Sequence, residues 1–156
     1  MDDEAKRERR LAFNRAFASS VPHNRALGVE IIDLGADFAL FRLPYAEHLV
    51  GNPDTGVMHG GVITALLDSC SGAAVFASLA RPAPIATLDL RIDYLKPAAA
   101  GREVLARATC YKQTRNVAFT RAVAYHDDED DPIASAAGAF MLSTKLGNVA
   151  PIKGPS

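Results

Sequence analysis

The stretch from Gly61 to Leu79 constrains the fold more than any other part of the chain. Its sequence is GVITALLDSCSGAAVFASL, which is rich in Ala, Ser and Gly and apolar on nearly every side. A helix that is apolar all round is stable in water only when other parts of the protein cover most of its surface. The sequence therefore predicts a central helix over 61–79 with the rest of the chain packed around it.

The segments on either side of this helix have the residue pattern of β-strands. Before it, two apolar-rich segments at 27–34 and 38–43 are separated by Gly35-Ala36-Asp37, which predicts a hairpin. After it, four strand-like segments follow with short connections between them. They cover 85–95, 103–111, 117–126 and 132–142. We expect these four strands to form an antiparallel meander.

One buried helix, placed between a hairpin and four further strands, has one economical packing, in which the sheet curls around the helix. The predicted fold class is α+β, with the hotdog architecture of an antiparallel sheet wrapped around one central helix. The small residues Ala134, Ala136 and Gly138 allow a strand to approach that helix closely.

The length of 156 residues and the 49% hydrophobic content suit one domain with a real core and are too small for two domains of ordinary size. We predict a single domain over 1–156. Residues 1–20 carry apolar residues at helical spacing and predict a short amphipathic helix that ends before Pro22.

The composition narrows the classes of partner and the compartment. The net charge of −1 shows no basic excess, so we expect neither nucleic acid nor an anionic membrane as a partner. The charged N-terminus and the absence of an apolar run near 20 residues predict a cytoplasmic protein without a signal or membrane span. Cys70 and Cys110 lie far apart without a CxxC motif, so we expect two buried thiols, no disulfide and no metal site.

Asp68 is the residue within the predicted helix that most needs an explanation. It lies eight positions after Gly60 in an otherwise apolar stretch, and ionised carboxylates are rarely buried without a partner or a task. It could cap a neighbouring loop, but no cationic residue lies three or four positions away on the helix. A functional carboxylate is therefore the favoured interpretation.

The motif His59-Gly60-Gly61 lies where the helix begins. Its glycines let a ligand approach the backbone, and the free N–H groups and helix dipole there suit an oxyanion or a polarised carbonyl. Alone, the motif is also typical of a plain turn with a surface histidine. Because Asp68 follows Gly60 by eight residues, the two together indicate a functional site.

The spacing of these residues adds a geometric constraint. At 1.5 Å per residue, Gly60 and Asp68 lie about 12 Å apart along one axis, which is too far for both to act on one carbonyl carbon. Either they belong to different sites, or two antiparallel copies of the helix bring Gly60 of one chain to Asp68 of another. The second arrangement requires a two-fold homodimer.

Two segments, NPDTGVMHGGVITALLDSCSG and TLDLRIDYLKPA, resemble the hotdog-fold thioesterases of the phenylacetate-degradation (PaaI-like) type, which are related to acyl-CoA thioesterase 13. The resemblance covers about residues 24–143. It implies that Asp68 is the catalytic carboxylate, that the Gly60 N–H polarises the thioester carbonyl and that His59 helps to hold it. It also implies that Asn52 orients the site and that the Thr87 hydroxyl holds the attacking water.

The implied reaction is the hydrolysis of an acyl-CoA to a free carboxylic acid and coenzyme A, without a cofactor or a metal. A thioester is electrophilic enough for a polarising helix terminus and a carboxylate to suffice, and no GxSxG elbow is present. Asp68 as general base and Asp68 as nucleophile both remain open.

Besides Gly61, the expected substrate-binding residues are cations that would meet the phosphates of coenzyme A. They are Lys96, Lys112 and, as the first choice because family members often carry a basic residue in this turn, Arg115.

Two other functions remain as alternatives. A hotdog hydratase or dehydratase would need a His-and-acid pattern that the sequence does not match. A non-catalytic acyl-CoA sensor would need room for a DNA-binding unit, and residues 1–23 have room for one helix.

For assembly, the strand Thr87–Tyr94 alternates charges in a way that can pair with itself across a two-fold axis. We therefore expect a homodimer, and a dimer of dimers beyond it.

Overall fold

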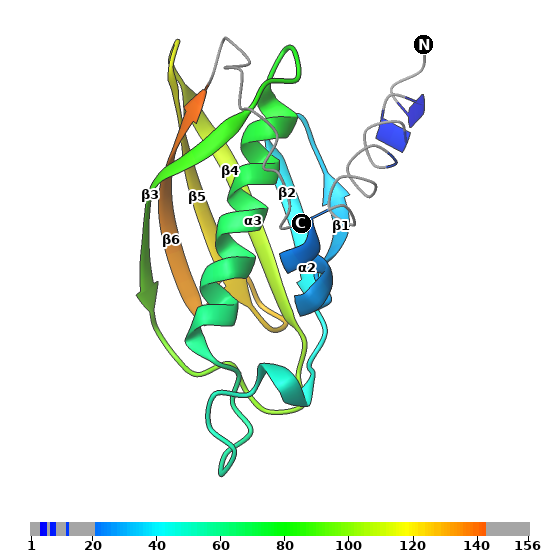
Figure 1. The fold of residues 1–156 in the computed structure, drawn as a ribbon, viewed down its shortest axis with the longest axis vertical. Helices are drawn as coiled ribbons and strands as arrows, with labels where there is room; N and C mark the ends of the chain where they lie inside the picture. Colours follow the sequence, from blue (N-terminus) through cyan, green and yellow to red (C-terminus); the bar gives the residue numbers. More distant parts are fainter. Residues whose placement is uncertain (1–3, 6, 9–11, 13–20, 143–156) are drawn as a thin grey trace, which may run out of the picture.

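The computed structural model describes residues 4–5, 7–8, 12 and 21–142, in which a curved six-stranded antiparallel sheet wraps around one long helix (Figure 1). The fold class and the hotdog architecture predicted from the sequence are confirmed. Most of the helix predicted over 1–20 lies outside the described residues. The elements are α2 (Pro22–Leu27), β1 (Glu30–Leu34), β2 (Phe38–Leu43), the 3-10 helix η1 (Glu47–Leu49), α3 (Gly60–Ser78), β3 (Ile85–Tyr94), β4 (Val104–Gln113), β5 (Val117–Tyr125) and β6 (Ala134–Leu142).

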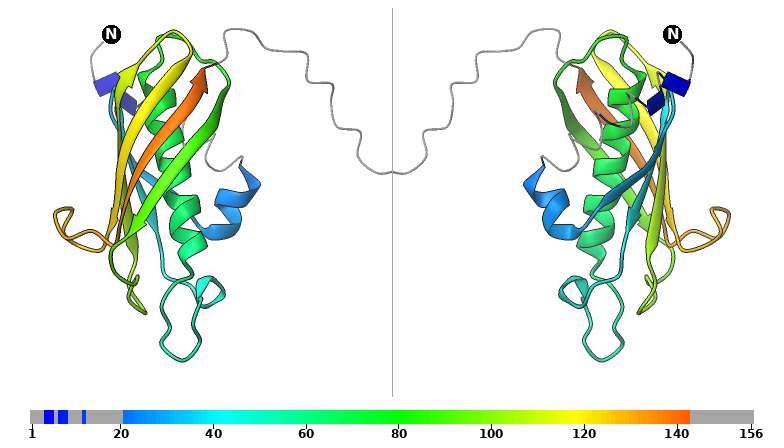
Figure 2. Two further views of the ribbon diagram at one scale, coloured as in Figure 1. Left: turned by 90° about the vertical axis from the view of Figure 1, so that its left-hand side faces the viewer. Right: turned by 90° about the vertical axis from the view of Figure 1, so that its right-hand side faces the viewer.

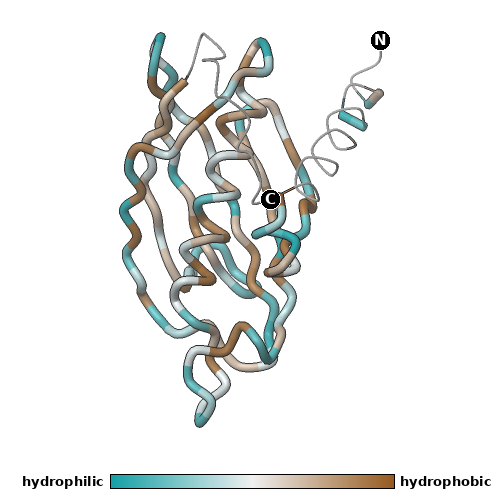
Figure 3. The backbone as a smooth tube through the Cα atoms, in the orientation of Figure 1, coloured by the Kyte–Doolittle hydropathy of each residue, from teal (hydrophilic) through white to brown (hydrophobic). Residues whose placement is uncertain are grey.

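The central helix α3 begins at Gly60 and ends at Ser78, within one residue of the prediction at each end. Its long apolar side chains pack into the sheet, where Leu66, Leu67 and Cys70 are completely buried. Figure 3 shows apolar colouring along α3 and hydrophilic colouring on the loop at its lower end. In length and composition α3 would also suffice for a membrane span, contrary to the expectation that no segment approaches one. In this fold it serves as the core helix.

The predicted meander is correct for β4, β5 and β6 and wrong for β3. The strand order is β1-β2-β4-β5-β6-β3, so β3 pairs with β6 at the far edge of the sheet. The connection over 95–103 is too long for a tight hairpin, and its Ala98 carbonyl accepts the N–H of Met58 beneath the start of α3 (3.2 Å). This crossover places the β1–β2 hairpin and β3 on opposite sides of the helix, so both edges of the sheet curl around it.

Apolar residues at 88, 90, 92 and 94 alternate with polar or charged residues at 87, 89, 91 and 93, but in the structure a β-bulge interrupts this alternation. The register of β3 against β6 shifts between Thr87 and Asp89, and Leu88 is 51% exposed at the irregularity. Because a bulge adds one residue to one strand, it reverses the inward and outward positions that follow it. Thr87 therefore faces α3 together with Leu90, although their spacing in the sequence suggests opposite faces.

The small residues of β6 were expected to let this strand approach α3 closely, but α3 packs mainly against β2, β4 and β5. Ala134 and Ala136 are buried against the core. A Cβ atom on Gly138 would lie 2.7 Å from the hydroxyl of Thr120 on the neighbouring strand. Only glycine fits between these strands at that position.

The short helix α2 was not expected, because Pro22 was interpreted as a helix end. Proline is well suited to the first position of a helix, where its missing N–H has no partner to lose, and here it begins α2. Gly28 ends the helix in the left-handed conformation (φ 79°), and β1 starts at Glu30 rather than at 27. The two side views show that α2 lies on the same side of the sheet as α3, while the loop over 126–133 projects from the opposite side (Figure 2).

Candidate active site

The hydrogen bonds of the first turn of α3 determine which of its backbone N–H groups are free to bind a ligand. His59 is the N-cap, and its Nδ1 accepts the N–H of Gly61 (2.9 Å). The predicted role of the Gly61 N–H in substrate binding is therefore not available in this arrangement. The N–H of Gly60 makes no hydrogen bond to any described residue and remains exposed at the positive end of the helix dipole.

The cap also determines what the imidazole of His59 can offer to a ligand. A ring nitrogen that accepts a hydrogen bond carries no proton, so the neutral ring carries its proton on Nε2. That Nε2–H can donate to a carbonyl oxygen beside the Gly60 N–H. The two groups form a pair of donors on one exposed turn.

Two hydroxyl groups that the sequence did not indicate hold this turn in place. Thr64 Oγ1 (3.2 Å) and Tyr94 OH (3.1 Å) both lie within hydrogen-bonding distance of the Gly60 carbonyl oxygen and of each other. Because each hydroxyl has one proton, one of them donates to the carbonyl and the other donates either to the same oxygen or to its neighbouring hydroxyl. Threonine bonding to the carbonyl four residues earlier is a recurrent helix feature that could have indicated Thr64. The position of Tyr94 depends on the pairing of β3, which the sequence did not reveal.

Asp68 lies half-buried in the middle of α3, as predicted. Its Oδ1 accepts a hydrogen bond from Thr87 Oγ1 (2.8 Å), and it forms no ion pair with any described residue. Because no backbone N–H of a described loop binds it, the loop-capping explanation has no support. Thr87 and Asp68 form one polar unit between β3 and α3.

A pocket of about 550 Å³ opens beside this unit, within the range usual for small-molecule sites. Its polar lining residues are Asp68, its partner Thr87, and Ser69 with its partner Asn24, whose side-chain oxygen accepts the Ser69 hydroxyl (2.9 Å). The rest of the lining is apolar or glycine. It consists of Val21, Ile31, Phe41, Gly72, Ala73, Phe76, Pro82, Ala83, Pro84, Ile85 and Phe140. The pocket has a polar end at residues 68–69 and an apolar remainder.

The start of α3 and the pocket do not meet within one chain. Gly60 and Asp68 lie eight residues apart on a continuous helix, about 12 Å along its axis. The geometric constraint derived from the sequence therefore holds in the fold.

Asn52 lies in the loop before α3 and not in the pocket of Asp68. Its side-chain oxygen accepts the N–H of Asp54 (3.0 Å), and its carbonyl accepts the N–H groups of Thr55 (3.2 Å) and Gly56 (2.8 Å). These bonds build the loop that leads to His59. Within its own chain, Asn52 has a structural role in this loop.

The three predicted phosphate-binding cations are not brought together. Lys96 follows β3 near the start of α3 and forms an ion pair with Asp131. Lys112 and Arg115 are exposed at the β4–β5 turn, which contacts the other end of α3 through Gln113 and Ser78 (3.5 Å). Since α3 has 19 residues, the two ends lie roughly 28 Å apart, and one phosphate group cannot contact both.

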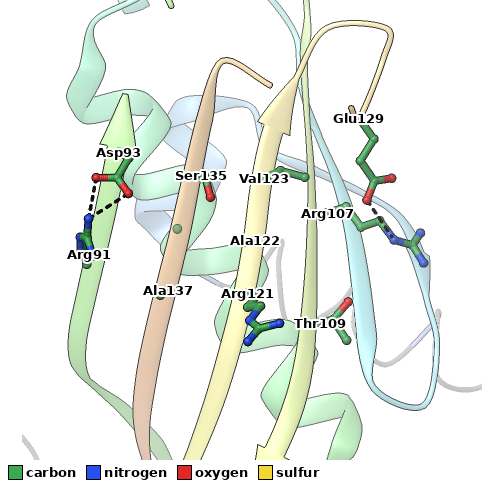
Figure 4. A pocket seen from close by; sticks show the side chains of 11 residues that line it. Arg91, Asp93, Arg107, Thr109, Arg121, Ala122, Val123, Glu129, Ser135 and Ala137 are labelled. Atoms are coloured by element: carbon green, nitrogen blue, oxygen red, sulfur yellow. Dashed lines mark hydrogen bonds and ion pairs between the residues drawn. The ribbon is translucent and has the colours of Figure 1, made fainter. Parts of the chain in front are cut away.

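A second pocket of about 380 Å³ lies on the outer face of the sheet (Figure 4). Its three arginines point to separate partners rather than to one centre. Arg91 pairs with Asp93 (3.2 Å), Arg107 approaches Glu129 (3.7 Å), and Arg121 lies over an aromatic ring (4.5 Å). This pocket lacks a convergent set of polar groups and is not the candidate active site.

Among the described residues, no cluster of metal-ligating side chains occurs, and both cysteines are free and buried.

An antiparallel sheet wrapped around one long helix is the hotdog fold. The family model of the thioesterase superfamily matches residues 55–133. The medium/long-chain acyl-CoA thioesterase YigI of Escherichia coli K12 is 33% identical over 139 residues, which cover 81% of this chain and 88% of YigI.

Solved structures agree with this match. A crystal structure of a Pseudomonas aeruginosa protein has 42% identity and a TM-score of 0.77, covering 85% of this chain and 98% of the other. A mutant of the phenylacetic acid degradation protein PaaI of Thermus thermophilus has 27% identity and a TM-score of 0.68, covering 77% and 97%. The chain belongs to the thioesterase superfamily, as a PaaI-like protein of the hotdog fold.

Proposed function

We propose that the protein hydrolyses acyl-CoA thioesters to a free carboxylic acid and coenzyme A. The observation that carries this proposal is a half-buried carboxylate, held by Thr87 and unpaired with any cation among the described residues, at the polar end of an apolar pocket. A carboxylate in this position can act on a carbonyl carbon while the pocket holds an acyl chain. The similarity to YigI, a medium/long-chain acyl-CoA thioesterase, supports the same substrate class.

The geometry supports polarisation of the thioester carbonyl by the start of α3. The Gly60 N–H and the Nε2–H of His59 are the two donors that would hold the carbonyl oxygen, and their bonds would strengthen as that oxygen becomes an oxyanion. Once the attacking oxygen has bonded to the carbonyl carbon, the carbon–sulfur bond breaks, and the thiolate of coenzyme A leaves and takes up a proton.

Asp68 would supply the attacking group by one of two routes. As general base it takes a proton from water, whose oxygen bonds to the carbonyl carbon. As nucleophile it forms a mixed anhydride that water then cleaves. In both routes the Thr87 hydroxyl orients the carboxylate through Oδ1, and its own oxygen remains able to accept a hydrogen bond from the water.

We further propose that each site combines Gly60 and His59 of one subunit with Asp68 of another. Two observations support this proposal: Gly60 and Asp68 of one chain lie about 12 Å apart along α3, and β3 is an edge strand that is free to pair with a second chain. This strand has ten residues, lies at the edge of the sheet and pairs only with β6 among the described strands. An exposed edge strand of this length can pair with a second copy across a two-fold axis. A dimer of dimers would be a further step of assembly.

The substrate phosphates are proposed to meet Lys112 and Arg115, because both side chains are exposed and neither forms an ion pair with a described residue. Lys96 is a weaker candidate because Asp131 already pairs with it.

Release of free thiol from a panel of acyl-CoA substrates tests the proposed activity. Turnover of at least one medium- or long-chain acyl-CoA is expected. Binding of acyl-CoA without thiol release would instead establish a sensor, and neither binding nor release would reject the substrate class.

A further inference from the structure

The pocket follows one face of α3. Asp68, Gly72 and Phe76 lie at intervals of four residues, so they share a helix face and span about 12 Å along the axis. Gly72 lies in the middle of this line, one turn beyond the proposed catalytic carboxylate. Along the helix, Gly72 therefore separates the polar end of the pocket at Asp68 from the apolar end at Phe76.

Neither backbone conformation nor packing explains a glycine at position 72. The helix interior is among the least favourable places for glycine, and Gly72 is not among the glycines with positive φ. A Cβ atom there would lie 3.7 Å from the ring of Phe140 and 3.8 Å from Ile85. These are ordinary contact distances, so an alanine would fit, and the missing side chain leaves space within the pocket.

We propose that the acyl chain of the substrate passes over Gly72 towards Phe140, Ile85 and Phe76, and that this glycine sets the longest chain that the pocket accepts. This inference rests on the proposed thioesterase function. It assigns the apolar end of the pocket to the acyl tail and the polar end, at Asp68 and Ser69, to the thioester.

Side chains of increasing size at position 72 test the proposal. Gly72→Ala adds one carbon and Gly72→Val adds three, and each methylene that loses its apolar contact weakens binding about fourfold. We expect Gly72→Val to lower kcat/KM on palmitoyl-CoA on the order of 50-fold relative to butanoyl-CoA, and Gly72→Ala to lower it about fourfold. Butanoyl-CoA should be turned over at nearly the wild-type rate, and the melting temperature of Gly72→Ala should rise because alanine favours helix.

Ala139→Val is the matched control. It adds two carbons to the outward face of the strand that carries Phe140, so the chain-length profile should stay as in the wild type. An unchanged ratio of palmitoyl to butanoyl turnover in Gly72→Val would overturn the proposal. So would an equal loss on all chain lengths with dissociation seen by light scattering, because the glycine would then serve subunit packing. If the wild type releases no thiol from any acyl-CoA, the proposed function itself has failed.

Discussion

Replacing Asp68 by asparagine separates the chemistry of the carboxylate from its place in the structure. Asparagine keeps a side-chain oxygen that can accept the Thr87 hydroxyl at the position of Oδ1 (2.8 Å), so the local geometry is preserved. The amide cannot take a proton from water or attack a carbonyl. We therefore expect Asp68→Asn to lose at least about 100-fold in kcat, the range for removal of a general base, or about 2.7 kcal/mol of transition-state stabilisation.

Folding of this variant should be unchanged or slightly improved, because a half-buried charge without a cationic partner is removed. Thiol release measures the rate, and circular dichroism with thermal melting checks the fold. Asp130→Asn is the matched control, since Asp130 is an exposed aspartate in the loop over 126–133, away from α3 and from the edge strand β3, and its turnover should remain within about twofold of the wild type, as for surface substitutions generally. Turnover of Asp68→Asn near the wild-type rate would refute the assignment of Asp68.

Three further predictions concern residues around the site. Tyr94→Phe removes one of the two hydroxyls on the Gly60 carbonyl, worth about 1 kcal/mol, so kcat should fall about fivefold with little change in KM; an unchanged kcat would show that this bond does not position the turn. Asn24→Ala leaves the Ser69 hydroxyl without its acceptor and should destabilise the fold by about 1–3 kcal/mol, and an unaltered melting temperature would argue against a structural role for this pair. Burial raises the pKa of the Cys70 thiol, so it should remain protonated and resist a thiol reagent at pH 8 until the protein is denatured; rapid labelling of the native protein would contradict its burial.

The sequence predicts the central helix and the carboxylate of Asp68 well, because both depend on local pattern. An apolar helix must be covered, and a carboxylate near its middle is then at least half-buried. The boundaries of α3 and the outward donors at Gly60 follow from the same local chemistry. His59 as the N-cap makes the start of the helix sharp.

The parts that were missed depend on contacts between distant segments. The position of β3 beside β6 is decided by how the sheet closes around α3, which no periodicity within 85–95 reveals. The bulge at Leu88 follows from the register between two strands, and it is this bulge that turns Thr87 towards Asp68. The contacts of Tyr94 with Gly60 and of Asn24 with Ser69 depend on where β3 and α2 pack against α3, which the sequence does not reveal.

Mixing two inactive variants tests most directly whether each active site draws on two subunits. His59→Ala and Asp68→Asn homodimers should each be poor enzymes. Unfolding and refolding them together in equal amounts, with differently tagged chains to show mixed dimers, places both lesions in one site of each mixed dimer and neither in the other. Random pairing makes half of the dimers mixed, so about a quarter of wild-type activity should return. If His59 and Asp68 of the same chain worked together, every site would keep one lesion, and activity at only the average of the two parents would contradict the shared site.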